Sequence, residues 1–208
     1  MFDNDIQRIG FCCKYMVPDQ TQTPKVLKEL QQPFTERMTT ITWLNRQEKS
    51  VAEERMLELV THNMQAAYNL VEYVSTLPAE RRMVRLGSNQ LPGATQEDWR
   101  YMWDDPTNIK MLEEGFAKVG ELARAKDVRL SFHPGQFTVL ASENDDVIKR
   151  SIDEFEYHVN MARWMGYGKE FQDFKCNVHI SGRKGAQGII DVLPKLSPEA
   201  RNIMTIEN

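Results

Sequence analysis

The sequence lacks the features that mark several large classes of protein. It has three cysteines in 208 residues and no CxxC pair, which argues against a disulfide framework and a thiolate zinc cluster. Cys12, Cys13 and Cys176 fall in segments that resemble strands, and we expect them to be small buried hydrophobic residues. No apolar run approaches the roughly 20 residues of a membrane span, and the first residues lack the basic and apolar regions of a signal peptide. We therefore expect a cytoplasmic protein that associates with no membrane.

Positive charge is not in excess either. Lysine and arginine number 26 against 30 aspartates and glutamates, which gives a formal net charge of -4. This balance argues against a generic polyanion binder, although a local basic patch can coexist with an acidic total. No obligate protein partner is evident.

Strand and helix patterns alternate along what we expect to be a single domain, residues 1–208. Apolar residues at three- and four-residue spacing predict helices packed on one face. The predicted helices lie near residues 26–30, 57–74, 112–123, 148–162 and 189–193. The predicted strands lie at residues 8–13, 83–86, 128–132, 176–180 and 203–207.

Such alternation implies parallel strands joined by right-handed crossovers, hence a doubly wound sheet or a (β/α) barrel. Polar residues at successive strand ends favour a TIM-type barrel, and no Gly-rich dinucleotide or P-loop fingerprint follows the first strand. A closed barrel has eight strands, and the sequence predicts about five. We therefore expect an incomplete α/β barrel, the amino-terminal piece of a longer protein, because a fifth strand without a neighbour would expose an unpaired edge.

Three of the predicted strands end in residues that can bind a metal. His133 and His179 follow apolar runs, and Glu207 ends the last strand. Two imidazoles and a carboxylate suit Mn²⁺, Fe²⁺ or Zn²⁺, and open positions on such an ion would activate a water. The lack of thiols in this set favours a catalytic rather than a structural ion.

Other residues with chemical potential have simpler interpretations. His62 and His158 lie inside predicted helices, where a packing or surface role is the commoner one. The tryptophans could stack on bases, yet core packing is their commoner use. They are Trp43, Trp99, Trp103 and Trp164.

The turn after His133 contains a side-chain amide and an aromatic ring, Gln136 and Phe137. On a DNA enzyme this pair could enter the duplex, with the ring replacing a stacked base and the amide filling hydrogen-bonding positions. Alternatively the turn is a loop cap with Phe137 folded inward. The residues alone favour neither alternative.

The motif Leu-Ser-Phe-His-Pro-Gly-Gln-Phe-Thr-Val-Leu at residues 130–140 resembles the hallmark of the ultraviolet damage endonucleases. The resemblance covers nearly the whole chain, and the combination is far more specific than any one motif. Its other parts are Arg8-Ile9-Gly10-Phe11, residues 39–46, Arg85-Leu86-Gly87-Ser88 with Pro92, Asn177-Val178-His179 and Thr205-Ile206-Glu207-Asn208.

This resemblance implies a TIM barrel and a cluster of divalent metals, often manganese, that hydrolyses the phosphodiester on the 5′ side of a lesion in damaged double-stranded DNA. Zn²⁺, Mg²⁺ and Co²⁺ are further candidates. His133, His179 and Glu207 would be the metal ligands and catalytic residues. Gln136 and Phe137 would probe the damage, and Phe11 would lie near the lesion.

The sequence departs from the family pattern at several positions. Phe11 and Phe137 stand where the family often has tyrosine, so each keeps the stacking face and loses the hydroxyl. Gln96 aligns with a histidine ligand, which is lost or displaced here. Further family ligands belong to later strands.

Two hypotheses compete with a DNA repair endonuclease. A sugar isomerase or epimerase on a similar barrel would also place histidine and glutamate at strand ends, but it would need no aromatic and amide probe. A non-catalytic protein that binds lesions would fit the missing histidine and the short chain. Nicking of irradiated DNA, isomerisation of free sugars and binding without nicking would separate the three.

Overall fold

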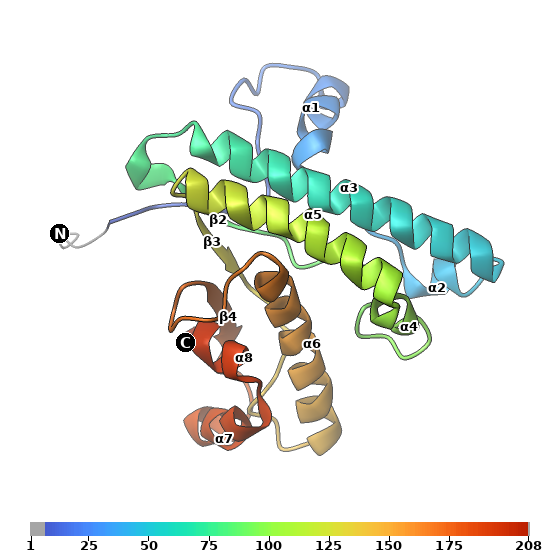
Figure 1. The fold of residues 1–208 in the computed structure, drawn as a ribbon, viewed down its shortest axis with the longest axis vertical. Coiled ribbons are helices and arrows are strands. Elements are labelled where there is room, and N and C mark those ends of the chain that lie inside the picture. Colours follow the sequence, from blue (N-terminus) through green and yellow to red (C-terminus); the bar gives the residue numbers. More distant parts are fainter. Residues whose placement is uncertain (1–6, 208) are drawn as a thin grey trace.

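Five parallel strands form the centre of the structure, a computed structural model that describes residues 7–207 (Figure 1). The strands are β1 (Phe11–Cys12), β2 (Met83–Arg85), β3 (Arg129–Phe132), β4 (Lys175–His179) and β5 (Met204–Glu207). They lie in the order β1-β2-β3-β4-β5, so that neighbours in the sheet are also successive in the sequence. Every predicted strand is present. Asn208, the last residue of the family-like motif, lies outside the described residues.

The strand order distinguishes the two folds that the sequence allows. A doubly wound sheet reverses its order after the first strand, whereas a barrel adds each strand on the same side of the one before. The order never reverses here, which confirms the TIM-type barrel. The barrel is incomplete, because within residues 7–207 β1 pairs only with β2, and β5 pairs only with β4.

Three long helices pack against the sheet and confirm the apolar stripes: α3 (Lys49–Ser75), α5 (Pro106–Ala125) and α6 (Asp145–Trp164). In Figure 1, α3 and α5 lie side by side, and α6 runs at a steep angle to them. Asp105 begins α5, because its carboxylate accepts from the backbone N–H groups of Thr107 and Asn108. Asn144 begins α6 in the same way.

Short helices fill the loops: α1 (Pro24–Gln31), α2 (Ile41–Leu44), α4 (Tyr101–Asp104), α7 (Gly185–Val192), α8 (Pro198–Ile203) and the 3₁₀ turns η1 (Gln32–Phe34), η2 (Ala79–Arg81) and η3 (Leu193–Lys195). The helices α1 and α7 confirm two predictions. The helices α2, α4 and α8 are too short to show an apolar period. Within residues 7–207, no helix is both long and apolar enough to cross a membrane.

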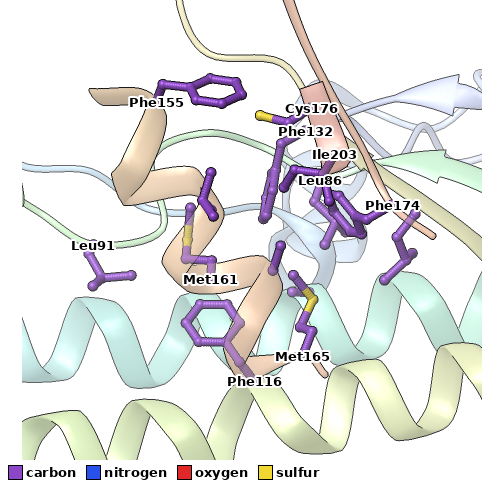
Figure 2. Close-up of a cluster of buried hydrophobic side chains, with 14 of the residues drawn as sticks. Leu86, Leu91, Phe116, Phe132, Phe155, Met161, Met165, Phe174, Cys176 and Ile203 are labelled. Carbon is purple, nitrogen blue, oxygen red and sulfur yellow. The ribbon is translucent and has the colours of Figure 1, made fainter. Parts of the chain in front are cut away.

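The apolar core lies between the sheet and the long helices. Figure 2 shows Phe132 and Cys176 of the sheet beside Phe155 and Met161 of α6, and all four are 0% exposed. Cys176 is therefore a small core residue, as predicted. Burial also raises the pKa of its thiol.

The same prediction is wrong for Cys12 and Cys13, which are exposed. Cys12 pairs with Arg85, and the preceding residue of β2, Val84, faces the helices and is fully buried. Since side chains alternate along a strand, Cys12 and Arg85 share the opposite, uncovered face. Cys13 has a φ of 60°, a left-handed conformation that ends β1 one residue before its predicted end, and β1 begins at Phe11, three residues after its predicted start.

The tryptophans confirm the core-packing expectation in part. Trp99 and Trp103 are 7% exposed, and their ring N–H groups donate to the side chain of Asn45 and the carbonyl of Pro92. Trp164 stacks on the ring of Phe116. The fourth, in α2, is more exposed and contributes less to the core.

Candidate metal centre

Three chemically active side chains meet at the carboxyl ends of neighbouring strands. His133 follows β3 directly, and His179 and Glu207 are the last residues of β4 and β5. The strand register places His179 opposite Glu207. One possible ligand atom from each residue lies within 4.8 Å of the other two. The structure therefore brings together the three side chains that the sequence singled out.

The cluster is tight on one side and open on the other. The Nε2 atom of His133 is 2.9 Å from Oε2 of Glu207, and the ring centroids of His133 and His179 are 4.7 Å apart. The side chain of His133 is 14% exposed, whereas that of Glu207 is 48% exposed. A ligand could therefore approach from the side of Glu207.

The hydrogen bonds of His133 limit what can lie between it and Glu207. Its Nδ1 atom is 2.9 Å from the carbonyl oxygen of Pro134, which can only accept, so Nδ1 carries a proton. In the neutral ring, Nε2 then has only a lone pair, which faces a carboxylate oxygen. Two acceptors at this distance repel each other unless a proton or a metal ion lies between them.

The donor set fits a divalent metal. Two imidazole nitrogens and a carboxylate oxygen suit Mn²⁺, Fe²⁺ or Zn²⁺. Adjacent ligands of an octahedral ion with bonds of about 2.1 Å lie roughly 3.0 Å apart, close to the 2.9 Å between His133 and Glu207. The exposure of Glu207 leaves room for water or substrate as a further ligand.

A set of buried hydrogen bonds holds His133 in place. The hydroxyl of Ser88 donates to the carbonyl of His133 at 2.7 Å, and the hydroxyl of Tyr157 donates to the carbonyl of Ser88 at 3.0 Å. The same Tyr157 hydroxyl accepts from the N–H of Leu91 at 3.0 Å. Burial raises the pKa of Tyr157, so its hydroxyl keeps its proton. Tyr157 carries no signal in the sequence, because it lies inside the predicted helix at residues 148–162.

His158 lies behind the cluster of His133, His179 and Glu207 and is not part of it. It is fully buried, with its ring edge-on to Phe132 at 5.5 Å between centroids. Its Nδ1 donates to the carbonyl of Glu154 at 2.8 Å. Burial lowers the pKa of His158 to about 4. The packing role predicted for His158 is confirmed, and His62 of α3 is likewise bonded to a backbone carbonyl, that of Thr35.

The loop after His133 presents the predicted probe pair to solvent. Gln136 is exposed, and Phe137 is 85% exposed, which rejects the alternative of an inward-folded ring. The loop is anchored where it turns back, because the N–H of Thr138 donates to the carbonyl of Gly135 at 2.9 Å and Thr138 is 4% exposed. A loop that is fixed at its base and carries an exposed aromatic ring at its tip can insert that ring into another molecule.

Phe11 and Gln96 are placed differently. Phe11 is half-buried and packs against the apolar core. Gln96 is exposed in the turn after β2, where it lines a cleft with Glu154 and Tyr157. Burial raises the pKa of Glu154 in that cleft. The part of each residue in lesion or metal binding stays a prediction.

Comparison with known proteins gives a consistent result. The family described as UV-endonuclease UvdE matches residues 7–208. A UV DNA damage endonuclease of Bacillus mycoides (strain KBAB4) is 25% identical over 178 residues, which cover 82% of this chain and 52% of that protein. One of Bacillus velezensis is 29% identical over 174 residues, which cover 80% of this chain and 50% of that protein.

The fold also has a counterpart among solved structures. The crystal structure of SacUVDE matches 97% of this chain and 61% of its own chain, with a TM-score of 0.73 and 22% sequence identity. This likeness shows the fold. The chain spans about half the length of these two Bacillus relatives.

Proposed function

The chain belongs to the UV-endonuclease UvdE family, and from that premise we propose that it acts in DNA repair. It provides the metal-binding strand ends of an endonuclease that hydrolyses the phosphodiester on the 5′ side of ultraviolet and other lesions. The substrate is damaged double-stranded DNA, and the cofactor is a divalent metal, with Mn²⁺ as the leading candidate. The observation that carries the proposal is the convergence of His133, His179 and Glu207 within 4.8 Å.

The chemistry follows from the donor set. When bound, a divalent metal supplies a Lewis acid for the phosphate and a water of lowered pKa. His133 and His179 hold the ion with neutral imidazoles, and the carboxylate of Glu207 offsets its charge. The bond from Ser88 to the carbonyl of His133 fixes the direction of the first imidazole.

The residues that recognise the lesion lie close in sequence to a metal ligand, and this couples recognition to cleavage. Phe137 and Gln136 lie on the loop that begins directly after the ligand His133. Insertion of the Phe137 ring into a weakened base stack would bring the neighbouring phosphate toward the open side of Glu207. Phe11 is proposed as a further lesion contact, through the part of its ring that the core leaves uncovered.

Lesion binding without cleavage is the second candidate function. It is favoured by Gln96, which stands at the position of a family histidine, and by the three-residue ligand set within residues 7–207. The sugar isomerase or epimerase hypothesis is set aside, because the family is one of endonucleases.

The test is nicking of ultraviolet-irradiated supercoiled plasmid with and without Mn²⁺. We expect nicks in irradiated plasmid only, and a loss of roughly a hundredfold or more in His133→Ala and Glu207→Gln, because a lost ligand misplaces both water and phosphate. Glu143→Gln, at an exposed carboxylate near the same edge, is the control. Metal-independent binding of irradiated DNA without nicks would favour the second candidate. Undiminished nicking in both ligand variants would reject the metal centre.

A further inference from the structure

Two adjacent cysteines lie at the carboxyl end of β1, on the edge of the sheet that carries the metal centre. Cys12 and Cys13 are both exposed. They are the only thiols among residues 7–207 that solvent can reach, because Cys176 is 0% exposed. The proposed endonuclease function uses neither of them.

Both cysteines lie next to Arg85. Cys12 is its register partner, and the backbone N–H of Cys13 donates to its carbonyl. The guanidinium of Arg85 lies close enough to both cysteines for its charge to act on them. Its Nε atom is buried and has no hydrogen-bond partner within residues 7–207. A fixed positive charge next to thiols favours the thiolate, which is the reactive form.

The backbone around the pair is held on both sides. The N–H of Cys13 donates to the carbonyl of Arg85 at 2.7 Å. Two residues further on, the ring of Tyr15 packs against Phe34 and Tyr73, with centroid distances of 4.4 and 4.7 Å. The thiol of Cys13 donates to the carbonyl of Leu86 at 3.7 Å, and partial burial raises the pKa of Cys13. These contacts make Cys13 the thiol that keeps its proton and reacts second.

We propose that Cys12 and Cys13 form a peroxide-sensitive dithiol that closes reversibly to a disulfide between neighbouring residues. The thiolate of Cys12 attacks hydrogen peroxide or an organic hydroperoxide, so that an S–O bond forms, the O–O bond breaks and hydroxide or alkoxide leaves. The sulfur of Cys13 then attacks the Cys12 sulfenic acid, so that the S–S bond forms and the oxygen leaves as water. Two electrons pass from the thiols to the peroxide.

Reversibility follows from the geometry of adjacent residues. Their Cα atoms are about 3.8 Å apart, below the separation of roughly 4.4–6.8 Å that is usual for a disulfide. A disulfide strained in this way is easily reduced, which is typical of regulatory rather than structural disulfides. Ring closure also disturbs the peptide that ends β1, so that Phe11 shifts against its partner Val84.

The effect of the disulfide on DNA binding rests on the proposed function, whereas the formation of the disulfide does not. The tryptic peptide Ile9–Lys14 contains both cysteines and no methionine, which makes it a clean reporter. After treatment of the 208-residue chain with hydrogen peroxide, we expect this peptide to lose the mass of two hydrogen atoms. Alkylation of its thiols should fall by about tenfold and recover with a thiol reductant, which does not repair methionine sulfoxide.

Variants separate the steps. Cys13→Ser should stop at a sulfenic acid on Cys12, trapped by dimedone, and Cys12→Ser should not react. Arg85→Gln should slow closure, whereas Cys176→Ala should leave it unchanged. Free thiols on both cysteines after peroxide, disulfide-linked dimers in place of the internal disulfide, or an unchanged rate in Arg85→Gln would overturn the proposal.

Binding to DNA is measured separately from the mass of the peptide that contains the two cysteines. Oxidised protein should bind irradiated duplex roughly tenfold more weakly than reduced protein, if Phe11 stacks on the lesion. Closure without any lesion binding in either state would reject the proposed function and leave the dithiol intact. Lesion binding without disulfide formation would reject the dithiol proposal and leave the proposed function intact.

Discussion

The hydroxyl of Ser88 donates a hydrogen bond of 2.7 Å to the backbone carbonyl of His133. This bond joins the loop after β2 to the first residue after β3, where the candidate metal centre begins. Tyr157 of α6 holds Ser88 from the other side. The direction of the His133 ring therefore depends on residues outside the candidate metal site, and such supporting contacts are common around histidines that bind a metal.

Ser88→Ala removes this support. We expect the affinity for Mn²⁺ to fall about tenfold, since loss of such supporting contacts typically costs 10–100-fold. The free energy of unfolding should fall by about 1 kcal/mol. Calorimetric titration and urea denaturation measure the two quantities. Ser75→Ala is the control, because its hydroxyl donates to a backbone carbonyl at the end of α3, far from the strand ends. Equal effects of both variants on Mn²⁺ affinity would refute the positioning role.

Truncation of the probe pair should change lesion preference more than stability. Phe137→Ala should lower the ratio of binding to irradiated over intact duplex by roughly five- to a hundredfold, because stacking on a base is worth about 1–3 kcal/mol. Gln136→Ala should lower it too, and Phe137→Tyr should be nearly neutral. Phe171→Ala, at an equally isolated ring that is 80% exposed, should leave the preference unchanged. The probe assignment fails if both alanine variants keep the parental ratio.

Acid should destabilise the protein partly through His158. Burial lowers its pKa from 6.5 to about 4 in the folded state, so between these values the unfolded chain binds a proton that the folded chain does not. The contribution of His158 to stability is therefore complete above pH 6.5 and is lost as the pH falls toward 4. A loss on the order of 3 kcal/mol is expected. Urea denaturation from pH 7 to 4 should show that the free energy of unfolding falls less in His158→Gln than in the parent. An equal fall in both proteins would contradict this role of His158.

The uncovered strand β5 should limit solubility of the 208-residue chain. Ile206 is 45% exposed and shares the face of its register partner Val178, which the helices bury. Ile206→Lys should raise the concentration at which the chain aggregates, because a charge blunts an open edge strand. Ile190→Lys, at a residue of α7 that is 55% exposed, should have a smaller effect. Light scattering against protein concentration measures both, and equal effects would point to general charge rather than the edge.

The sequence predicted the elements that have a long apolar period. Stripes such as that of α6 and the apolar runs before His133 and His179 located the helices and strand ends, because burial on one face imposes the period. The convergence of the ligand residues followed from parallel strands, whose carboxyl ends lie on one edge. The helix α8 was missed, since its six residues complete fewer than two turns.

Other features depend on contacts between distant segments. Tyr157 supports His133 through a bond between α6 and the loop after β2, and no sequence pattern in either segment predicts this bond. The exposure of Cys12 could not be predicted, because it depends on which face of β1 the helices cover. The outward position of Phe137 could not be predicted either, because it depends on whether another segment covers the loop.

The central claim is that His133, His179 and Glu207 hold a divalent metal, and titration of Mn²⁺ followed by electron paramagnetic resonance tests it directly. The account predicts saturable binding by the parent chain and at least about tenfold weaker binding by His179→Ala and Glu207→Gln, with Glu143→Gln like the parent. Equal Mn²⁺ binding by the parent and both ligand variants would contradict it.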